Sequence, residues 1–458
     1  MTLTPAAPRR VLPTLNQDGS RRWIRPRPFD GRYVRARRRV GWGLIALFAG
    51  LPFLRVGGAP ALLFDIPARQ FHFFGATLRA TDGVLLMLLL LAIFVSIFAV
   101  TAWVGRAWCG WACPQTVYME FVFRPLERWL EGGRNAQLRL DREGPNARRF
   151  VRYAVFALLS VVLANLFLSY FVGVERLATW MTRSPLSHPT GFLVVLVTSL
   201  LVYADFGYFR EQMCTVACPY ARLQSALLDP KSIIIGYDAA RGEPRGHGAG
   251  KGDCVDCGAC VATCPTGIDI REGLQLECIA CAQCVDACDS VMTKFERPRG
   301  LIRYDAGHVL HPVKGSVRPH RPRLFAYAIM LAALLGALVL FARASSAPEI
   351  TLLRGLGAPF EVVDSRVRNQ LRIKIQNRSN QDATYRLGVV RSSSVELVAP
   401  ENPLIVAAGE QGTTSLFVMV PLDSLQNGSR TITLEVSNGQ GFDVQLPYRI
   451  LGPTKAGS

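Results

Sequence analysis

The chain has 458 residues, half of them hydrophobic, and a formal net charge of +18 at pH 7. This combination is unusual for a soluble enzyme and typical of a membrane protein whose basic residues lie in loops on one side. No motif that reads nucleic-acid bases accompanies the charge, so we expect no nucleic-acid partner.

The N-terminal half predicts a tail followed by membrane helices. Residues 1–39 are polar and rich in arginine, and we predict a disordered or surface-bound basic cytoplasmic tail. The first apolar run starts at Val40, is interrupted by Arg55 and extends through Gly57. Further apolar runs are near the length of about 20 residues that a bilayer requires. They predict transmembrane helices at 84–104, 154–173 and 191–206, which together with the first apolar run make 40–206 a four-span membrane region, and a fifth transmembrane helix at 324–342.

Loop charge predicts the orientation of these helices. The 105–152 loop carries many arginines, whereas the 58–83 and 174–190 loops carry two each. Because basic loops stay on the cytoplasmic side, the N-terminus and the polar insertion 207–323 are expected inside. Five spans then place the C-terminus outside.

The C-terminal region, 347–458, has a different character. Segments such as Gln370–Gln376, Ser415–Val420 and Thr431–Val436 alternate apolar and polar residues between asparagine- and glycine-rich turns. Short alternating strands at this spacing predict an all-β, Ig-like sandwich.

Two cysteine quartets mark the polar insertion. Both follow the spacing C-x2-C-x2-C-x3-C, which is typical of ferredoxins that carry two [4Fe–4S] clusters and in which the fourth cysteine ligates the other cluster. We therefore predict an α+β ferredoxin-like domain with two such clusters. The expected ligands are Cys254, Cys257, Cys260 and Cys288 for cluster 1, and Cys264, Cys278, Cys281 and Cys284 for cluster 2. Zinc is the alternative, but its sites use cysteine pairs with a longer spacer.

Four further cysteines form two C-x3-C-P pairs, Cys109–Cys113 and Cys214–Cys218, just past the second and fourth predicted spans. Residues i and i+4 share one face of a helix, so the pairs could present four thiolates to one centre. Thiolates favour Cu(I), zinc or iron–sulfur clusters. The duplication favours a metal or redox role over buried structural cysteines, and the metal stays open.

Three other polar residues are weaker candidates. His72 and His188 fall on the predicted outer loops and could ligate copper or haem, hydrogen-bond a quinol, or simply lie at a polar surface. Asp205 ends the fourth predicted span, where an ionisable side chain is a functional candidate or a solvated helix end.

The chain resembles the cytochrome c oxidase accessory protein family called CcoG, FixG or RdxA. The resemblance is carried by the segments 107–118, 211–222 and 253–269, which hold both C-x3-C-P pairs and the first quartet, and by the β tail. It implies a multi-pass protein of the bacterial inner membrane with a periplasmic C-terminal domain. It also implies a cupric reductase that supplies Cu(I) for assembly of cbb3-type oxidase. The implied partners are the lipid bilayer, copper ions, oxidase assembly factors or a copper transporter, and an electron donor that no motif identifies.

The resemblance implies that electrons pass through the two clusters to copper near Cys109, Cys113, Cys214 and Cys218. The alternative is quinol–ferredoxin electron transfer that feeds another membrane or periplasmic reductase. A third reading is a scaffold whose exported domain docks onto an oxidase subunit.

Overall fold

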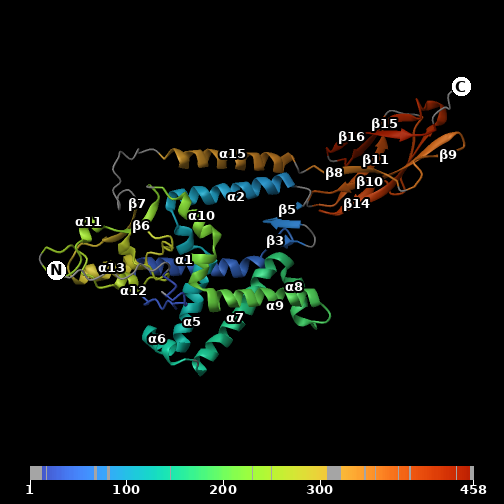
Figure 1. The fold of residues 1–458 in the computed structure, drawn as a ribbon. Coiled ribbons are helices and arrows are strands. Elements are labelled where there is room, and N and C mark those ends of the chain that lie inside the picture. The colour runs from blue at the N-terminus through green and yellow to red at the C-terminus, as the bar shows by residue number, and fades with distance from the viewer. Residues whose placement is uncertain are drawn as a thin grey trace. The chain divides into compact units, whose positions relative to one another are not determined.

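The computed structural model describes residues 13–16, 18–66, 70–79, 83–144, 146–229, 231–248, 250–306, 321–344, 347–355, 357–379, 381–390, 394–439 and 441–453. The chain divides into two compact units, Met1–Leu335 and Gly336–Ser458 (Figure 1). The first holds nearly all the helices and every cysteine, and the second is built of strands.

Four helices in the described residues are long and apolar enough to cross a membrane. They are α2 (Gly83–Val104), α7 (Ala147–Val172), α9 (Pro189–Ala204, continued by the π-helix η3, Asp205–Phe209) and α15 (Pro322–Ala344). Large apolar side chains such as Leu90, Leu158 and Leu201 are exposed on them. An apolar surface of this extent fits lipid rather than water, and the second to fifth predicted spans are confirmed as long apolar helices.

Helix α7 begins earlier than predicted, at Ala147 rather than Ala154. The Asn146 side chain caps it by accepting a hydrogen bond from the Arg149 N–H at 3.1 Å. Arg152, in the second turn, is buried against carboxylates of a neighbouring helix. The arginines that look like loop residues in the sequence are therefore the first turns of the helix.

The first helix, α1 (Arg32–Gly50), also starts before the predicted Val40. The N–H groups of Tyr33 and Val34 donate to the Asp286 carboxylate of the inserted domain, which caps the helix from outside. At the other end the Tyr170 hydroxyl of α7 donates to the Phe48 carbonyl at 2.7 Å. Its first half carries five arginines, and α1 is not among the four helices that meet the length and hydropathy requirements for a span.

The described part of the predicted tail, from residue 13, is not a solvated segment. Arg25 is buried, donates to Glu127 at 2.6 Å and forms a forked pair with Asp141. The Arg27 N–H donates to the Ala262 carbonyl, beside the cluster-binding segment. The prediction of a disordered tail is wrong for the residues around Arg25, because acidic side chains elsewhere in the fold pair with this arginine.

Short strands fill the connection between α1 and α2. Strands β1 (Arg55–Val56) and β2 (Ala59–Pro60) form one hairpin. A second antiparallel sheet contains β3 (Leu62–Asp65), β4 (Gln70–Phe73) and β5 (Ala76–Arg79). Helix α8 (Val174–Thr182) follows α7. The sequence analysis predicted none of these elements.

Three short helices follow the first C-x3-C-P pair. Helices α4 (Pro114–Tyr118), α5 (Arg124–Glu131) and α6 (Arg134–Glu143) occupy the arginine-rich loop before α7, with the π-helix η2 (Met119–Phe123) joining α4 to α5.

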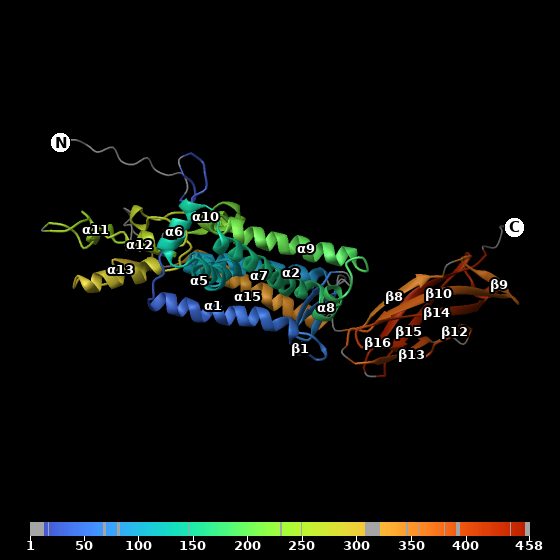
Figure 2. The same cartoon turned by 90° about the horizontal axis from the view of Figure 1, so that it is seen from below.

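The inserted domain is α+β, as predicted. Strands β6 (Ile233–Tyr237) and β7 (Ile302–Ala306) pair antiparallel, with Ile233 opposite Ala306. Between them lie α11 (Ala239–Gly242), α12 (Ala259–Ala262), the turn η5 (Ile270–Glu272) and α13 (Gln283–Lys294). Figure 2 shows these helices grouped at one end of the long helices.

The second unit is a two-sheet β structure, as its alternation predicts. One sheet has the order β12–β14–β10–β8 with β9 on β10, and the other has the order β13–β11–β15–β16. The strand bounds are β8 Glu349–Arg354, β9 Glu361–Val363, β10 Arg366–Gln376, β11 Ala383–Val389, β12 Glu396–Val398, β13 Leu404–Val406, β14 Gln411–Pro421, β15 Ser429–Ser437 and β16 Asp443–Leu451. Alternate residues of β10 and β14, such as Leu371 and Val418, are fully buried between the sheets.

A buried ionic cluster joins the segments of the helical unit. Glu127 of α5 accepts from Arg25 at 2.6 Å, from Arg152 of α7 at 3.0 Å, and from Arg210 at 2.8 and 2.9 Å. All four side chains are at most 3% exposed. The three guanidinium groups hold the pKa of Glu127 well below its usual range despite its burial. One carboxylate thus connects the N-terminal segment with α5, α7 and the end of α9.

Replacing Glu127 by alanine is expected to destabilise the helical unit by about 3–5 kcal/mol, because three buried arginines lose their shared carboxylate. Thermal unfolding of detergent-solubilised protein measures the effect. The matched control is Glu143→Ala, which removes an exposed pair with Arg139 and is expected to cost at most about 1 kcal/mol. Equal melting temperatures for the two variants would contradict the role given to Glu127.

Candidate functional site

The eight cysteines of the insertion line two neighbouring hollows. The first hollow is lined by Cys254, Cys257, Cys260 and Cys288. The second hollow is lined by Cys264, Cys278, Cys281 and Cys284, and Cys260 also borders it. The fourth cysteine of each quartet therefore lies with the first three of the other. This is the partition that exchanged ligands require, while ligation itself stays a prediction.

The two cysteine loops have the same backbone conformation. Asp256 and Gly258, on either side of Cys257, have φ of 54° and 64°. Ala280 and Ala282, on either side of Cys281, have φ of 54° and 60°. Left-handed conformations are uncommon for residues other than glycine and cluster at functional sites. These turns let each cysteine loop wrap around its hollow before the following helix, α12 or α13, begins.

The donor sets fit iron–sulfur clusters better than single metal ions. Among the described residues no three histidine, cysteine, aspartate or glutamate side chains are close enough to hold one ion. A structural zinc draws four ligands to about 2.0–2.3 Å from one point. In a [4Fe–4S] cluster the four cysteine ligands are distributed around a larger core. Four sulfurs around an apolar hollow are therefore the arrangement that a cluster requires.

Burial disfavours the negatively charged thiolate form of these cysteines. It raises the pKa of Cys278 to about 11 and that of Cys281 to about 12. In the first hollow it raises the pKa of Cys260 to about 11 and that of Cys288 to about 12. Without a metal these side chains are neutral thiols, whereas the iron ligand is the thiolate.

The two C-x3-C-P pairs fold in the same way. In the first, the Cys113 N–H donates to the Trp108 carbonyl, five residues back along the chain. In the second, the Cys218 N–H donates in the same way to the Met213 carbonyl. Cys113 and Cys218 each precede a proline that starts a helix, α4 and α10 (Pro219–Leu227) respectively. The sequence duplication is therefore a structural one.

The duplicated pairs come together at the end of the long helices, and we call Cys109, Cys113, Cys214 and Cys218 the membrane-edge cysteines. Burial raises the pKa of Cys214 to about 12, with further contributions from Cys113, Cys109 and Cys218. Burial raises the pKa of Cys109 to about 11, with contributions from Cys113 and Cys218. Each pair thus lies within electrostatic reach of the other.

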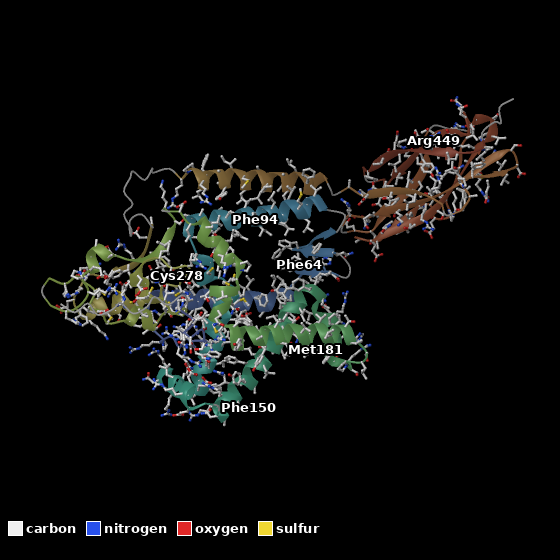
Figure 3. The ribbon with its side chains drawn as sticks, viewed as in Figure 1. Phe64, Phe94, Phe150, Met181, Cys278 and Arg449 are labelled. Carbon is white, nitrogen blue, oxygen red and sulfur yellow. The ribbon has the colours of Figure 1, made fainter. Side chains whose placement is uncertain are left out.

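The membrane-edge cysteines lie directly against the second hollow. Cys109 packs in one apolar cluster with Ile279 and Cys281, and Cys214 borders it. A Cβ atom added to Gly110 would lie 2.4 Å from the Ile279 carbonyl oxygen, so only glycine allows this approach. Cys278, labelled in Figure 3, lies where the inserted domain meets the helix ends.

Two aromatic side chains fix the same junction. Trp111 Nε1 donates to the Tyr304 hydroxyl at 3.0 Å, and that hydroxyl donates to the Ala280 carbonyl at 2.5 Å. The carbonyl belongs to the strained loop before Cys281. The loop around the first C-x3-C-P pair (α3, Ala107–Trp111) is therefore held on the cluster-binding loop through both backbone and side chains.

The other predicted candidates are placed differently. Asp205 accepts from Gln115 at 3.0 Å and contributes to the raised pKa values of Cys113 and Cys214, so it belongs to the membrane-edge site. His72 lies in β4 and His188 just before α9, at the opposite ends of α2 and α9 from the cysteines.

The sequence analysis missed buried polar residues beside the cysteines. The Cys109 thiol donates to Gln224 at 3.1 Å, and Arg106 donates to the same amide oxygen at 3.4 Å. Arg37 of α1 donates to the Gly110 carbonyl at 2.7 Å. A polar residue beside an apolar run was the available signal, but many such residues are solvated.

Comparison with known proteins agrees with this site. A family described as "4Fe-4S dicluster domain" matches residues 209–249 and 244–307, and one described as "4Fe-4S binding domain" matches 86–133. Together they cover all twelve cysteines. The "IG-like fold at C-terminal of FixG" matches 339–453, in agreement with the β unit.

Full-length relatives are also similar. Protein RdxA of Cereibacter sphaeroides is 35% identical over 428 residues, which are 88% of this chain and 90% of RdxA. Protein RdxB of the same organism is 31% identical over 86% of this chain and 88% of RdxB. Nitrogen fixation protein FixG of Rhizobium meliloti is 40% identical over 306 residues, 62% of this chain and 57% of FixG.

Replacing Gly110 by alanine is expected to disturb the junction, because the new Cβ would collide with backbone atoms of Ile279 and Ala280. We expect a lower melting temperature and a changed EPR spectrum of the cluster in the second hollow. The matched control is Gly43→Ala in α1, where nothing lies within 4 Å of the added atom. A Gly110→Ala variant that matches wild type in both measurements would show that the close approach is not required.

Proposed function

Because the chain belongs to the FixG/RdxA family of membrane iron–sulfur electron-transfer proteins, we propose that it reduces Cu(II) to Cu(I) with electrons from two [4Fe–4S] clusters. The copper ion is the substrate, and the membrane-edge cysteines are its site. The product would serve copper delivery and assembly of a cbb3-type oxidase, with assembly factors or a copper transporter as partners.

The observation that carries the proposal is the contact between Cys109 and the loop of Cys281. It supports a continuous route from the first hollow, through the second, to the membrane-edge cysteines. When bound, the clusters supply one-electron transfer. The residues of this chain hold the two centres side by side and exclude water from the buried sulfurs.

The membrane-edge site has donors for both oxidation states of copper. Oxygen and nitrogen ligands suit Cu(II), whereas thiolates select Cu(I). Asp205 and Gln115 supply oxygen atoms next to the four thiols. One electron converts the bound ion from a form that the carboxylate can hold to a form that thiolates hold better.

We further propose that α1 is a fifth span, that the N-terminus and inserted domain are cytoplasmic, and that the β unit is periplasmic. Loop charge supports this orientation, as do the contacts of α1 with the inserted domain at one end and with the far end of α7 at the other. At about 1.5 Å per residue, its 19 residues are about 28 Å long, close to the thickness of a bilayer core.

A second candidate function is electron transfer from a quinol to another membrane or periplasmic reductase. The His188 Nε2 atom, at the start of α9, is buried without a hydrogen-bond partner in the described structure. Such an atom could bind a quinol hydroxyl. Cluster reduction that depends on menaquinol and leaves Cu(II) unreduced would favour this function.

Changing all four membrane-edge cysteines to serine is expected to abolish copper reduction and leave the clusters in place. Anaerobically purified wild type and variant are each expected to contain about eight irons per chain, the content of two [4Fe–4S] clusters. Copper binding and the rate of Cu(II) reduction by the pre-reduced protein are expected to fall at least tenfold in the variant only.

Cys257→Ser is the matched control, because Cys257 is an exposed member of the first quartet. It should lower the iron content without removing copper binding. Iron above about eight per chain that disappears in the quadruple variant would instead assign an iron–sulfur centre to the membrane-edge cysteines and overturn the copper proposal.

A further inference from the structure

Two buried arginines near the junction of Cys109 with the Cys281 loop have hydrogen-bond donors without partners. Arg37 is fully buried, and only its Nε has a partner, the Gly110 carbonyl, while both terminal nitrogens have none. Arg106 is 5% exposed, and its Nη1 has no partner. Unpaired buried donors are costly, so their presence requires an explanation.

The positions of these arginines indicate the missing acceptor. Arg37 holds the carbonyl of Gly110, whose backbone lies against Ile279 and Ala280 in the loop of Cys281. Arg106 and the Cys109 thiol share the amide oxygen of Gln224, and Cys109 packs against Ile279 and Cys281. Cys278 and Cys281 line the second hollow. Among the described residues no ion pair within 4 Å joins either guanidinium group to a carboxylate; Glu120, which acts on Arg37 from farther away, is paired with Arg124. The unpartnered donors of both arginines are therefore available to whatever fills that hollow.

The first hollow has a different electrostatic environment. Its arginine, Arg271, is neutralised by Asp269 and Asp256, which accept from its side-chain nitrogens at 2.5–2.8 Å. Arg271 still favours negative charge at Cys260, whereas Asp269 and Asp289 act on Cys260 and Cys288 in the direction that disfavours it. The first hollow thus has paired or negative charges around it, and the second has unpaired positive ones.

We propose that Arg37 and Arg106 donate their unpartnered N–H groups to the sulfurs of the cluster in the second hollow and hold its reduction potential above that of the first. This inference rests on the two clusters of the proposed function. Hydrogen bonds to sulfur and net charge are known determinants of cluster potential. Reduction adds one negative charge, which the two arginines stabilise.

Burial alone would have the opposite effect. The second hollow is the more enclosed of the two, since Cys278 and Cys281 are buried while Cys257 is exposed. A low dielectric disfavours the more negative, reduced form, but it also strengthens the attraction of a nearby positive charge. Two unpaired arginines at the cysteine ligands outweigh the loss of solvation.

The potential difference gives electron transfer a direction. One electron leaves the exposed first cluster and is gained by the second, and no bond or proton is exchanged. The second hollow is the one whose Cys281 packs against Cys109. Electrons would therefore gather at the centre next to the membrane-edge site, where Arg106 shares the amide oxygen of Gln224 with the Cys109 thiol.

EPR-monitored redox titration of the purified full-length protein tests the proposal. In Arg37→Gln and in Arg106→Gln, we expect the potential of the second cluster to fall. The ratio of its reduced to oxidised form at a fixed potential should drop at least tenfold, which is about 59 mV for a one-electron couple. The potential of the first cluster should stay unchanged.

Two further variants separate charge from structure. Arg39→Gln removes an exposed charge from the same helix and is expected to leave both potentials unchanged. Arg37→Lys keeps a positive charge but loses the forked donors, and its shift should be smaller than that of Arg37→Gln. If Arg37→Gln lowers the iron content, Arg37→Lys and Arg106→Gln decide the question.

The outcomes distinguish this inference from the function on which it rests. Fewer than two cluster signals in wild type would overturn the proposed function itself. Two intact clusters whose potentials do not change in Arg106→Gln and Arg37→Lys would overturn only the role of the arginines. A second cluster below the first in potential in wild type would also refute it.

Discussion

The structure of the helical unit depends on one buried carboxylate. Glu127 accepts from three arginines that come from the N-terminal segment, from α7 and from the end of α9. A buried ion pair is a poor source of stability by itself, because desolvation opposes the Coulomb attraction. Its value here is positional, since none of the three arginines can move without leaving a buried charge unpaired.

Both groups of cysteines are tied to this ionic cluster. The Arg210 carbonyl accepts a hydrogen bond from the side chain of Gln115, two residues after Cys113. The next residue, Glu211, has a carboxylate oxygen 3.4 Å from a guanidinium nitrogen of Arg124. Arg124 in turn donates to the Pro265 carbonyl, immediately after Cys264. Arg210 adopts a left-handed conformation, with φ of 51°, at the bend that turns α9 into the second C-x3-C-P loop. The position of the membrane-edge cysteines and the seating of the inserted domain thus follow from the same set of charges.

Duplication is the second organising feature. Two helix ends share the same C-x3-C-P turn, and the two cysteine loops share the same left-handed pattern. Repetition places like groups together, but the surroundings make them different. Paired acidic residues surround the first hollow, and unpaired arginines lie beside the second. Chemically similar centres can therefore hold different potentials.

The sequence by itself determined the features that depend on local spacing. Cysteines three or four residues apart must share a loop, apolar runs of 20 residues must avoid water, and alternation predicts sandwich strands; all of these are seen in the structure. The exchanged grouping of Cys264 and Cys288 was also expected, since the motif carries it. Only the tertiary structure decided that Arg25 of the N-terminal segment is buried, that Gly110 lies against Ile279, and that Arg37 contacts the Gly110 carbonyl while Arg106 lies beside Cys109. These contacts join residues as far apart as Arg25 and Glu127, 102 positions along the chain. A basic residue looks the same in a sequence whether water or a buried acceptor balances its charge, and that difference exists only once the chain has folded.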